Sequence, residues 1–300
     1  MSLIFAEYPA ELVPKVAGTT FGKGRAVNMK RIGLQHGAAL LALCAALTGG
    51  AAGAQVLEAF DYAVTTPLIG KSGGTGWASA WASGNAQGSF TDSIAAGSLS
   101  YSTLVTSGNS YAFTSAAGGT FVDRERTATT AFTSGTVYMS FLARPSAAGG
   151  YFGFNFGTPG SSNAFVGGGN GFYGLGIAGG SSTNSTMPDT LNLTRLLVLR
   201  VDLGVGNDTV RLYIDPTVGG VEPVIANVTR TDFDLGSINR YTATFGQGAG
   251  GQLDELRSGR TFASVTPSAA VVVPEAGSAS LLLCAAAGAL GLVARRRSAR

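Results

Sequence analysis

The chain has 300 residues and a formal net charge of +3, but residues 55–270 hold 14 Asp plus Glu against 11 Lys plus Arg, a balance of −3. The basic excess therefore lies in the termini, and the body lacks the positive footprint that a nucleic-acid partner needs. The single histidine, His36, and both cysteines, Cys44 and Cys284, lie in apolar terminal segments, which excludes Ser-His-Asp, Cys-His and His-ligated zinc sites from the body.

The N-terminal region carries the pattern of a secretory signal peptide. A short basic segment at 29–31 precedes an apolar run at 37–47, and small residues follow. The predicted cleavage site is formed by Ala52, Ala54 and Gln55. The sequence thus predicts a signal peptide over 29–54 and a mature chain that begins at Gln55. Residues 1–28 are interpreted as a leader, either a misassigned start or a disordered extension.

The body has the alternation of half-buried β-strands. In 208–215, one face carries Val210, Leu212 and Ile214 and the other carries polar residues. The preceding segment 194–203 repeats this pattern, and the glycines of 204–208 predict a hairpin loop between the two. Inward faces are also predicted for Val137, Met139 and Phe141, and for Phe152, Phe154 and Phe156.

Further short strands are predicted between clusters of Gly, Ser and Asn. They cover 56–62, 99–105, 120–127, 172–178, 224–228, 240–245 and 253–258. About eleven such strands without helical periodicity predict an all-β fold, a two-layer antiparallel β-sandwich of the jelly-roll kind. No fixed-period repeat interrupts it, so one domain over 55–266 is expected. The glycines at 167–169 and 179–180 are interpreted as flexible loops.

Candidate chemistry in the body is limited to carboxylates. Asp254 and Glu255 are adjacent on a predicted strand and point to opposite faces, so they cannot form a glycosidase pair. Asp232 and Asp234 share a face, but their flanks are typical of a loop. The sequence therefore predicts no catalytic residues and no enzyme. A structural calcium ion near 207–208 or Asp123 is an alternative to plain turn geometry for these side chains.

Four aromatic residues are candidates for stacking on sugar rings: Trp77, Trp81, Tyr151 and Tyr173. Large rings of this kind also serve as core or rim residues, and that alternative stays open. Thr127, Thr129, Thr242 and Thr244 form two i, i+2 threonine pairs of the sort that ice-binding surfaces use. They fall far short of a regular array.

The C-terminal region predicts a membrane anchor. Residues 276–294 are apolar and uncharged, close to the roughly 20 residues that a spanning helix needs. Arg295, Arg296 and Arg297 supply a membrane stop and place the tail 295–300 in the cytoplasm by the positive-inside rule. With the signal peptide at the other end, the body is expected outside. A buried core helix is the alternative.

The order of elements at this end resembles a known sorting signal. Val273, Pro274 and Glu275, followed by a small-residue apolar stretch and an Arg cluster, resemble the PEP-CTERM signal of bacterial surface proteins. The third motif position is Ala276 where that family usually has Pro. The resemblance implies processing by an exosortase-type enzyme after the spacer 267–275. The same kind of tail is sometimes labelled an ice-binding protein C-terminal domain. That label alone does not indicate that a protein binds ice.

The two ends of the body also resemble a known family. Phe60-Asp61-Tyr62, then Gly73-Gly74-Thr75-Gly76-Trp77 and Trp81, resemble the opening of laminin-G-like, concanavalin-like jelly rolls. Residues 253–257 and 263–267 resemble the last strand and exit of those domains. First and last strands of such sandwiches commonly pair, so both termini are expected to leave on one side.

Together these features predict an exported, PEP-CTERM-sorted protein that crosses the inner membrane, is anchored there and ends at the cell surface or in the extracellular matrix. Its sandwich is expected to be structural or to bind exopolysaccharide. Two alternatives are a carboxylate-dependent glycan hydrolase or lyase and an ice-binding protein.

Overall fold

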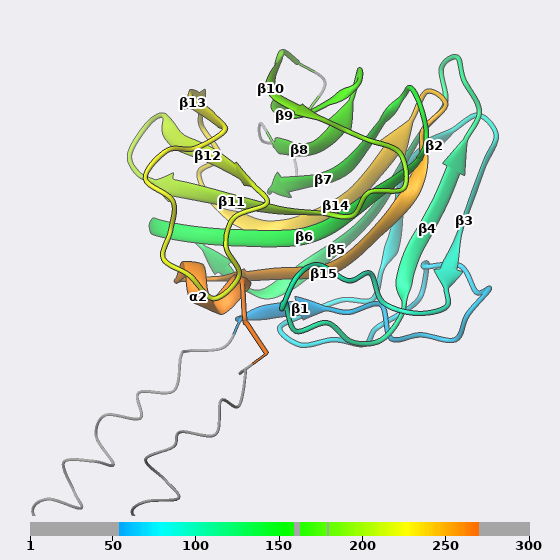
Figure 1. The fold of residues 1–300 in the computed structure, drawn as a ribbon, viewed down its shortest axis with the longest axis horizontal. Coiled ribbons are helices and arrows are strands. Elements are labelled where there is room, and N and C mark those ends of the chain that lie inside the picture. Colours follow the sequence, from blue (N-terminus) through cyan, green and yellow to red (C-terminus); the bar gives the residue numbers. More distant parts are fainter. Residues whose placement is uncertain (1–53, 159–162, 179, 270–300) are drawn as a thin grey trace, which may run out of the picture. The chain divides into compact units, whose positions relative to one another are not determined.

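Two antiparallel sheets lie face to face and enclose the main hydrophobic core (Figure 1). The computed structural model describes residues 54–158, 163–178 and 180–269. Within them, the predicted all-β, two-layer sandwich is confirmed. Non-consecutive strands are neighbours in both sheets, so the chain crosses repeatedly between the layers.

The first sheet contains eight strands in the order β13-β12-β11-β6-β15-β4-β3, with β1 paired to β15. Their bounds are β1 (Val56–Glu58), β3 (Phe90–Ala95), β4 (Ser110–Ser115), β6 (Gly135–Ala147), β11 (Arg195–Leu203), β12 (Asp208–Ile214), β13 (Val228–Phe233) and β15 (Gly250–Gly259). The second sheet contains seven strands in the order β10-β9-β8-β7-β14-β5-β2. Their bounds are β2 (Ala82–Gln87), β5 (Phe121–Phe132), β7 (Tyr151–Gly157), β8 (Ala164–Gly169), β9 (Phe172–Ile177), β10 (Ser182–Pro188) and β14 (Ile238–Gly246).

The alternation predicted for the β11–β12 hairpin is confirmed. Val201 pairs with Val210 and Leu199 with Leu212, and all four side chains are buried in the main core. The aromatic run of β7 faces the same core from the second sheet, where Phe154 packs edge-on against Phe141 of β6 at 4.9 Å between ring centroids. Side chains of period two on both sheets therefore fill the space between them.

The first and last strands of the sandwich pair as expected. Val56 of β1 lies opposite Ser258 of β15, and the Gln55 amide donates to the Ser258 carbonyl at 2.7 Å. The described chain therefore begins and ends at the same end of the molecule (Figure 1).

Two inward-facing arginines of β5 form ion pairs that join the sheets. Arg126 pairs with the Glu58 carboxylate of β1, and both side chains are 1% exposed. Arg124 pairs with Asp92 of β3 through Nε at 2.9 Å and Nη2 at 3.1 Å. Charges this deeply buried are tolerated because they are paired and hydrogen-bonded.

The Glu58 carboxylate is the centre of a larger buried cluster. It accepts hydrogen bonds from the Phe60 amide at 2.9 Å, the Tyr62 hydroxyl at 2.8 Å and the Trp81 indole at 2.9 Å. The Arg126 guanidinium lies over the Trp77 ring at 4.6 Å from its centroid. The aromatic opening segment of the domain therefore wraps a buried ion pair.

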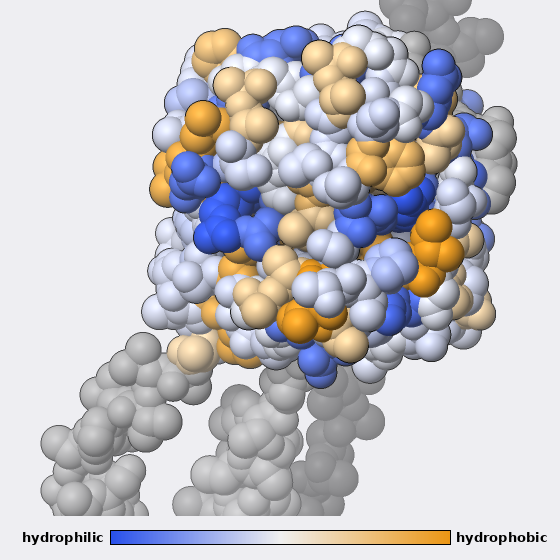
Figure 2. Space-filling model, turned by 90° about the vertical axis from the view of Figure 1, so that its right-hand side faces the viewer, coloured by the Kyte–Doolittle hydropathy of each residue, from blue (hydrophilic) through white to orange (hydrophobic). Residues whose placement is uncertain are grey.

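The outer face of the first sheet is covered over part of its area. A second hydrophobic cluster lies there, in which Phe262 of the short helix α2 (Phe262–Val265) packs edge-on against Tyr138 and Tyr213. At the end of the molecule where β2, β3 and β4 lie, Figure 2 shows hydrophobic residues scattered singly among neutral and hydrophilic ones. Such scattered residues are normal for a protein surface.

Three local predictions are wrong. Residues 99–105 form no strand, because the Leu99 amide is bound by the Asp254 carboxylate at 2.7 Å and Leu99 and Leu104 pack in the second cluster. Residues 224–227 belong to a loop, and β13 begins only at Val228. The glycines at 167–169 are not a flexible loop but the end of β8.

The predicted signal sequence, the sorting motif and the apolar segment 276–294 lie outside the described residues. Among the residues that the structure describes, no helix has the length and apolar character needed to cross a membrane. The membrane anchor therefore stays a prediction of the sequence.

The Glu58 cluster allows a test of what holds the sheets together. Replacing Arg126 by Met leaves a buried carboxylate without its cation, and we expect the free energy of unfolding to fall by about 3–5 kcal/mol. Urea denaturation measures this loss. The double variant Glu58→Gln with Arg126→Met is expected to lose clearly less than the two single losses added together. Strict additivity would contradict a coupled pair.

Candidate functional site

A groove crosses the outer face of the second sheet. It consists of two adjoining hollows of about 470 Å³ and 560 Å³, both lined by Asp123, Asn155 and Ala178. Strands β5, β14 and β7 form its floor, since each sends alternate side chains outward into it. The groove is therefore built on three central strands of a sheet rather than on loops.

Strand β5 places two carboxylates in the groove. Asp123 and Glu125 are two positions apart and lie on the same face, while Arg124 and Arg126 between and after them face inward. Opposite β5, β14 contributes Thr242 and Thr244 through the pairs Thr242–Glu125 and Thr244–Asp123. Carboxylates and hydroxyls thus meet along one line of the sheet.

Asp123 is the more enclosed of the two acids. Burial raises its pKa and the neighbouring negative charge of Glu125 raises it further, whereas a hydrogen bond with Thr244 and the charges of Arg240 and Arg124 lower it, and the net pKa lies above the usual value. A carboxyl group in this situation retains its proton to higher pH than an ordinary aspartate.

Glu125 has a different electrostatic environment. Its Oε2 accepts a hydrogen bond from Arg240 Nη1 at 3.3 Å, and the Glu125 side chain is 35% exposed. The groove therefore holds one carboxyl group with a raised pKa, Asp123, beside one that accepts a hydrogen bond from a guanidinium, Glu125.

Aromatic side chains border the groove on the side of Asp123. Tyr151 of β7 and Phe165 of β8 form an edge-on pair with ring centroids 6.2 Å apart, and Phe121 lies at the start of β5. The Thr244 hydroxyl lies within hydrogen-bonding reach of Tyr151 and of Asp123. Rings beside polar groups are typical of surfaces that bind sugars, because the ring covers the apolar face of the sugar while hydroxyls find partners.

Beside the groove, β8 and β9 form a smaller hollow of about 90 Å³ that Tyr151 and Phe165 also line. Gly167 pairs with Gly174, and an added Cβ at either position would meet backbone oxygen at 2.0 Å and 2.6 Å, respectively. These positions therefore exclude side chains. The close strand approach leaves an open bed beside Tyr151 and Phe165.

Asn155 is an unsatisfied group at the junction of the two hollows. Its Oδ1 is buried and has no hydrogen-bond partner within the described residues. A buried acceptor without a partner is costly unless water or a ligand donor satisfies it. The amide is therefore placed to accept from a hydroxyl of a molecule that fills the groove.

Of the four residues predicted to stack on sugars, only Tyr151 lines the groove. Trp81 is 1% exposed and Tyr173 is fully buried, both in the main core. Trp77 packs against Arg126 and edge-on against Tyr241 at 5.2 Å. The core alternative therefore holds for these three residues, while Phe121 and Phe165 are aromatic groove residues that the sequence analysis missed.

The other predicted acids serve the fold. Asp254 is buried and accepts from Ser98 Oγ at 2.6 Å, and burial raises its pKa to about 8. Glu255 pairs with Arg257 at 2.6 Å and Asp232 pairs with Arg230. Asp234 is exposed on the loop after β13.

The residues named for calcium also have local partners. Asp208 accepts from the Gly204 amide at 3.0 Å, which is turn geometry, and from the distant Leu235 amide at 2.7 Å. In 54–158, 163–178 and 180–269, no group of three or more His, Cys, Asp or Glu residues is arranged to hold a metal ion.

The threonine pair of β14 is not exposed. Thr242 and Thr244 are 5% and 4% exposed in the groove floor. Their hydroxyls therefore serve the groove, and the ice-binding alternative gains no support from them.

The carboxylate pair could have been found from the sequence. Residues 120–127 were predicted as a strand, and an Asp-x-Glu spacing on a strand puts both acids on one face. The spacing does not predict which residues of a neighbouring strand lie beside the two acids. Arg240 and Thr244 come from β14, more than a hundred residues later in the chain.

Comparison with known proteins finds no matching family model and no matching curated protein. Several solved structures are similar at low level. They include a glycosyl hydrolase family 16 protein from Mycobacterium smegmatis (13% identity, 68% of this chain and 98% of that one, TM-score 0.40) and the alginate lyase from Corynebacterium sp. (13%, 50% and 76%, TM-score 0.36). The globular domain of T. cruzi calreticulin also matches (13%, 78% and 99%, TM-score 0.37). These values do not assign the chain to a family.

The prediction that the chain is no enzyme is contradicted. The matched structures include glycosyl hydrolases, a beta-1,3-glucanase and an alginate lyase, at TM-scores of 0.31 to 0.40. The condition that the sequence analysis set for a hydrolase or lyase, two acids on one face, is also met by Asp123 and Glu125 in the groove. This pair lies on β5 and is distinct from the acid pairs at 232/234 and 254/255.

The electrostatic account of the groove predicts how Asp123 titrates. Replacing Glu125 by Gln removes a like charge and is expected to lower the pKa of Asp123, whereas replacing Arg240 by Gln removes an opposite charge and is expected to raise it. Carboxyl-carbon NMR titration measures both shifts. Shifts of the same sign in the two variants would contradict the account.

Proposed function

We propose that this protein is a glycan-acting β-sandwich that binds a polysaccharide chain in the groove of its second sheet and hydrolyses it with Asp123 and Glu125. The observation that carries the proposal is the presence of two carboxyl groups on one face of β5, Asp123 with a raised pKa and Glu125 paired with Arg240. Tyr151 and Phe165 would hold sugar rings at one end, and the Asn155 amide would accept from a sugar hydroxyl.

The environments assign a role to each acid. Asp123, with its raised pKa, would donate a proton to the glycosidic oxygen as the bond to the anomeric carbon breaks. Glu125, paired with Arg240, would act as the carboxylate that attacks that carbon or activates a water molecule. Water supplies the hydroxyl group of the new reducing end, so the reaction needs no further reactant.

The spacing of the acids is compatible with such chemistry. Same-face positions on one strand are about 6.8 Å apart along the backbone. Carboxyl groups about 5–5.5 Å apart suit retention of anomeric configuration and those about 6.5–9.5 Å apart suit inversion. Side-chain rotation on one strand covers both ranges, so the configuration of the first product distinguishes them.

The terminal segments support a place of action outside the cytoplasm. We infer that the signal peptide over 29–54 exports the chain and that residues 276–294 hold it in the inner membrane. An exosortase-type enzyme acting near Val273–Ala276 would then release it to the cell surface or matrix, where exopolysaccharide is the partner. The described domain has both ends on one side, which suits a body tethered at one end.

Assay of the full chain on a panel of soluble polysaccharides tests the groove. We expect new reducing ends with at least one β-glucan or acidic glycan. Asp123→Asn and Glu125→Gln are each expected to lose activity by about a thousandfold. Asp232→Asn is the matched control, because this exposed acid of β13 lines neither of the two hollows.

Three outcomes would count against hydrolysis. Binding that depends on Tyr151 without any cleavage would leave a lectin. Unsaturated product ends, seen by ultraviolet absorbance, would indicate a lyase. Cleavage that survives both carboxylate variants would place the chemistry elsewhere.

Intact mass measurement of the protein from membrane and extracellular fractions tests the targeting. We expect loss of residues 1–54 in both fractions. A membrane form that retains residues 276–300 and a released form that ends near Pro274 would agree with anchorage followed by sorting. Full-length material in the cytoplasmic fraction alone would contradict export.

A further inference from the structure

The connection between β12 and β13 presents aliphatic side chains to solvent. Val221, Val224 and Ile225 are 90%, 101% and 84% exposed. Single exposed apolar residues are normal, but three within five positions form a concentrated apolar tip. The sequence predicted a strand over 224–228, but residues 224–227 form a loop.

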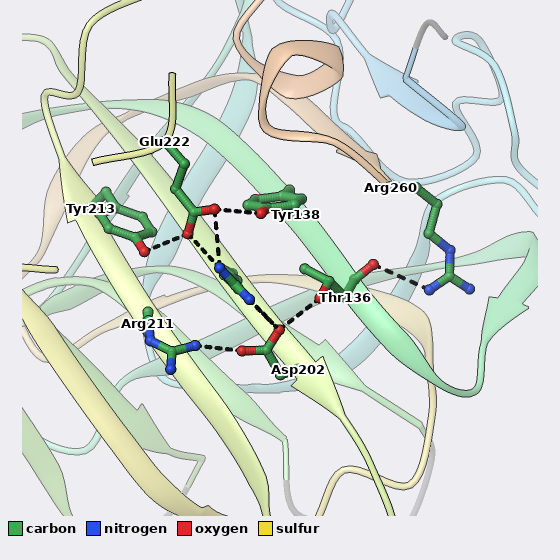
Figure 3. A network of polar contacts seen from close by, with 8 residues as sticks. Thr136, Tyr138, Asp202, Arg211, Tyr213, Glu222 and Arg260 are labelled. Carbon is green, nitrogen blue, oxygen red and sulfur yellow. Dashed lines mark hydrogen bonds and ion pairs between the residues drawn. The ribbon is translucent and has the colours of Figure 1, made fainter. Parts of the chain in front are cut away.

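This apolar tip lies on a loop that is held firmly to the sheet. The Glu222 carboxylate accepts from the Tyr138 and Tyr213 hydroxyls, each at 2.6 Å, and from Arg200 Nη1 at 3.0 and 3.1 Å (Figure 3). Farther along the loop, the Asn227 amide donates to the Leu212 carbonyl at 2.8 Å. Arg200 also bonds to Asp202, which ties the anchor to the centre of β11.

In this loop the charged side chain faces the protein and the aliphatic side chains face solvent, the opposite of an ordinary surface loop. Glu222 is the only charged residue in 216–227, and it points to the sheet, while the neighbouring valines and isoleucine point to solvent. Although burial alone raises the pKa of Glu222, the hydrogen bonds from Tyr138, Tyr213 and Arg200 outweigh it and lower the pKa. The anchor is therefore ionised and intact at neutral pH.

The loop also lies beside the point where the described chain ends. The Gly219 amide donates to the Thr266 carbonyl at 2.9 Å, and the Ala269 amide donates to the Thr103 carbonyl at 2.8 Å. Figure 1 shows this connection running down to α2 at the end of the molecule where the chain leaves. Seven residue steps separate Ala269 from the apolar segment that begins at 276, a reach of about 25 Å when fully extended.

We propose that Val221, Val224 and Ile225 rest in the headgroup region of the bilayer that holds the C-terminal segment, so that the β12–β13 loop is a membrane-contacting foot of the sandwich. The proposal rests on the inferred membrane tether of the proposed function and is independent of the groove chemistry. A loop without exposed charge and with an aliphatic tip suits the boundary between headgroups and acyl chains. The tip is too small for a stable second copy, which needs about 800 Å² per partner.

The foot has a consequence for the groove. A body that contacts the bilayer at one loop as well as through its tether cannot rotate freely about the tether. The outer face of the second sheet is then held at a fixed orientation to the membrane surface.

Tryptophan placement in the full chain, reconstituted in phosphatidylcholine vesicles, tests the foot. Ile225→Trp puts a reporter in the apolar tip. Val205→Trp is the matched control, since Val205 is 107% exposed in the loop at the other end of β12. With brominated acyl chains, we expect the emission added by Ile225→Trp to fall at least about twofold relative to unbrominated vesicles. The emission added by Val205→Trp should be unchanged.

The outcomes separate the foot from the tether and from the groove. Flotation of the protein with vesicles, together with equal quenching at both positions, would overturn the foot and leave the tether. A blue-shifted but unquenched Ile225→Trp would show the tip covered by protein and would also overturn it. Failure of the parent chain to float would overturn tether and foot together, while hydrolysis of soluble glycans would be unaffected.

Discussion

The rest of the structure depends on the alternation of charges along β5. Asp123, Arg124, Glu125 and Arg126 follow one another on this strand, and the two arginines turn inward to carboxylates of the opposite sheet. A charge buried between sheets is stable only with its partner in place. A shift of one residue would bury Asp123 and Glu125 and expose both arginines, so the inner pairs fix the register of the strand. Because side chains alternate along a strand, the register that places the arginines on the inner face also places Asp123 and Glu125 on the outer face.

The groove follows from this constraint. Because Arg124 and Arg126 are bound to Asp92 and Glu58, the two acids that alternate with them, Asp123 and Glu125, must face away from the core. The pairing of β5 with β14 then brings Arg240 and the threonine hydroxyls to these acids. The groove side chains on the outer face are thus positioned by the ion pairs on the inner face. A site on central strands is also more rigid than a site on loops.

The aromatic opening of the domain belongs to the same constraint. Trp81 and Tyr62 donate to the Glu58 carboxylate, and Trp77 lies against the guanidinium of Arg126. These residues carried the resemblance to laminin-G-like domains in the sequence. In the structure they satisfy a buried charge, which explains why aromatic rings with polar tips occur at these positions. The inner face of β5 therefore carries residues that stabilise the fold, and its outer face carries the carboxyl groups of the groove.

The sequence predicted well where alternation was strong and local. The β11–β12 hairpin, the aromatic strand β7 and the pairing of the first and last strands all follow from period-two patterns and end positions. Prediction from the sequence failed where a residue's hydrogen-bond partner is distant in the chain and where glycines leave a strand without side chains. Leu99 reads as part of a strand, but its amide is bound by Asp254 far along the chain. The glycines of β8 read as a loop because close strand approach leaves no side-chain pattern.

Electron density for a bound oligosaccharide tests the central claim most directly, because the account assigns the groove to one face of one strand. In a crystal of the Glu125→Gln variant grown with a cleavable glycan, the account predicts a sugar chain across β5, β14 and β7. Its glycosidic oxygen should lie within hydrogen-bonding distance of Asp123, with a ring on Tyr151. Sugar bound instead on the outer face of the first sheet, with the groove open, would contradict it.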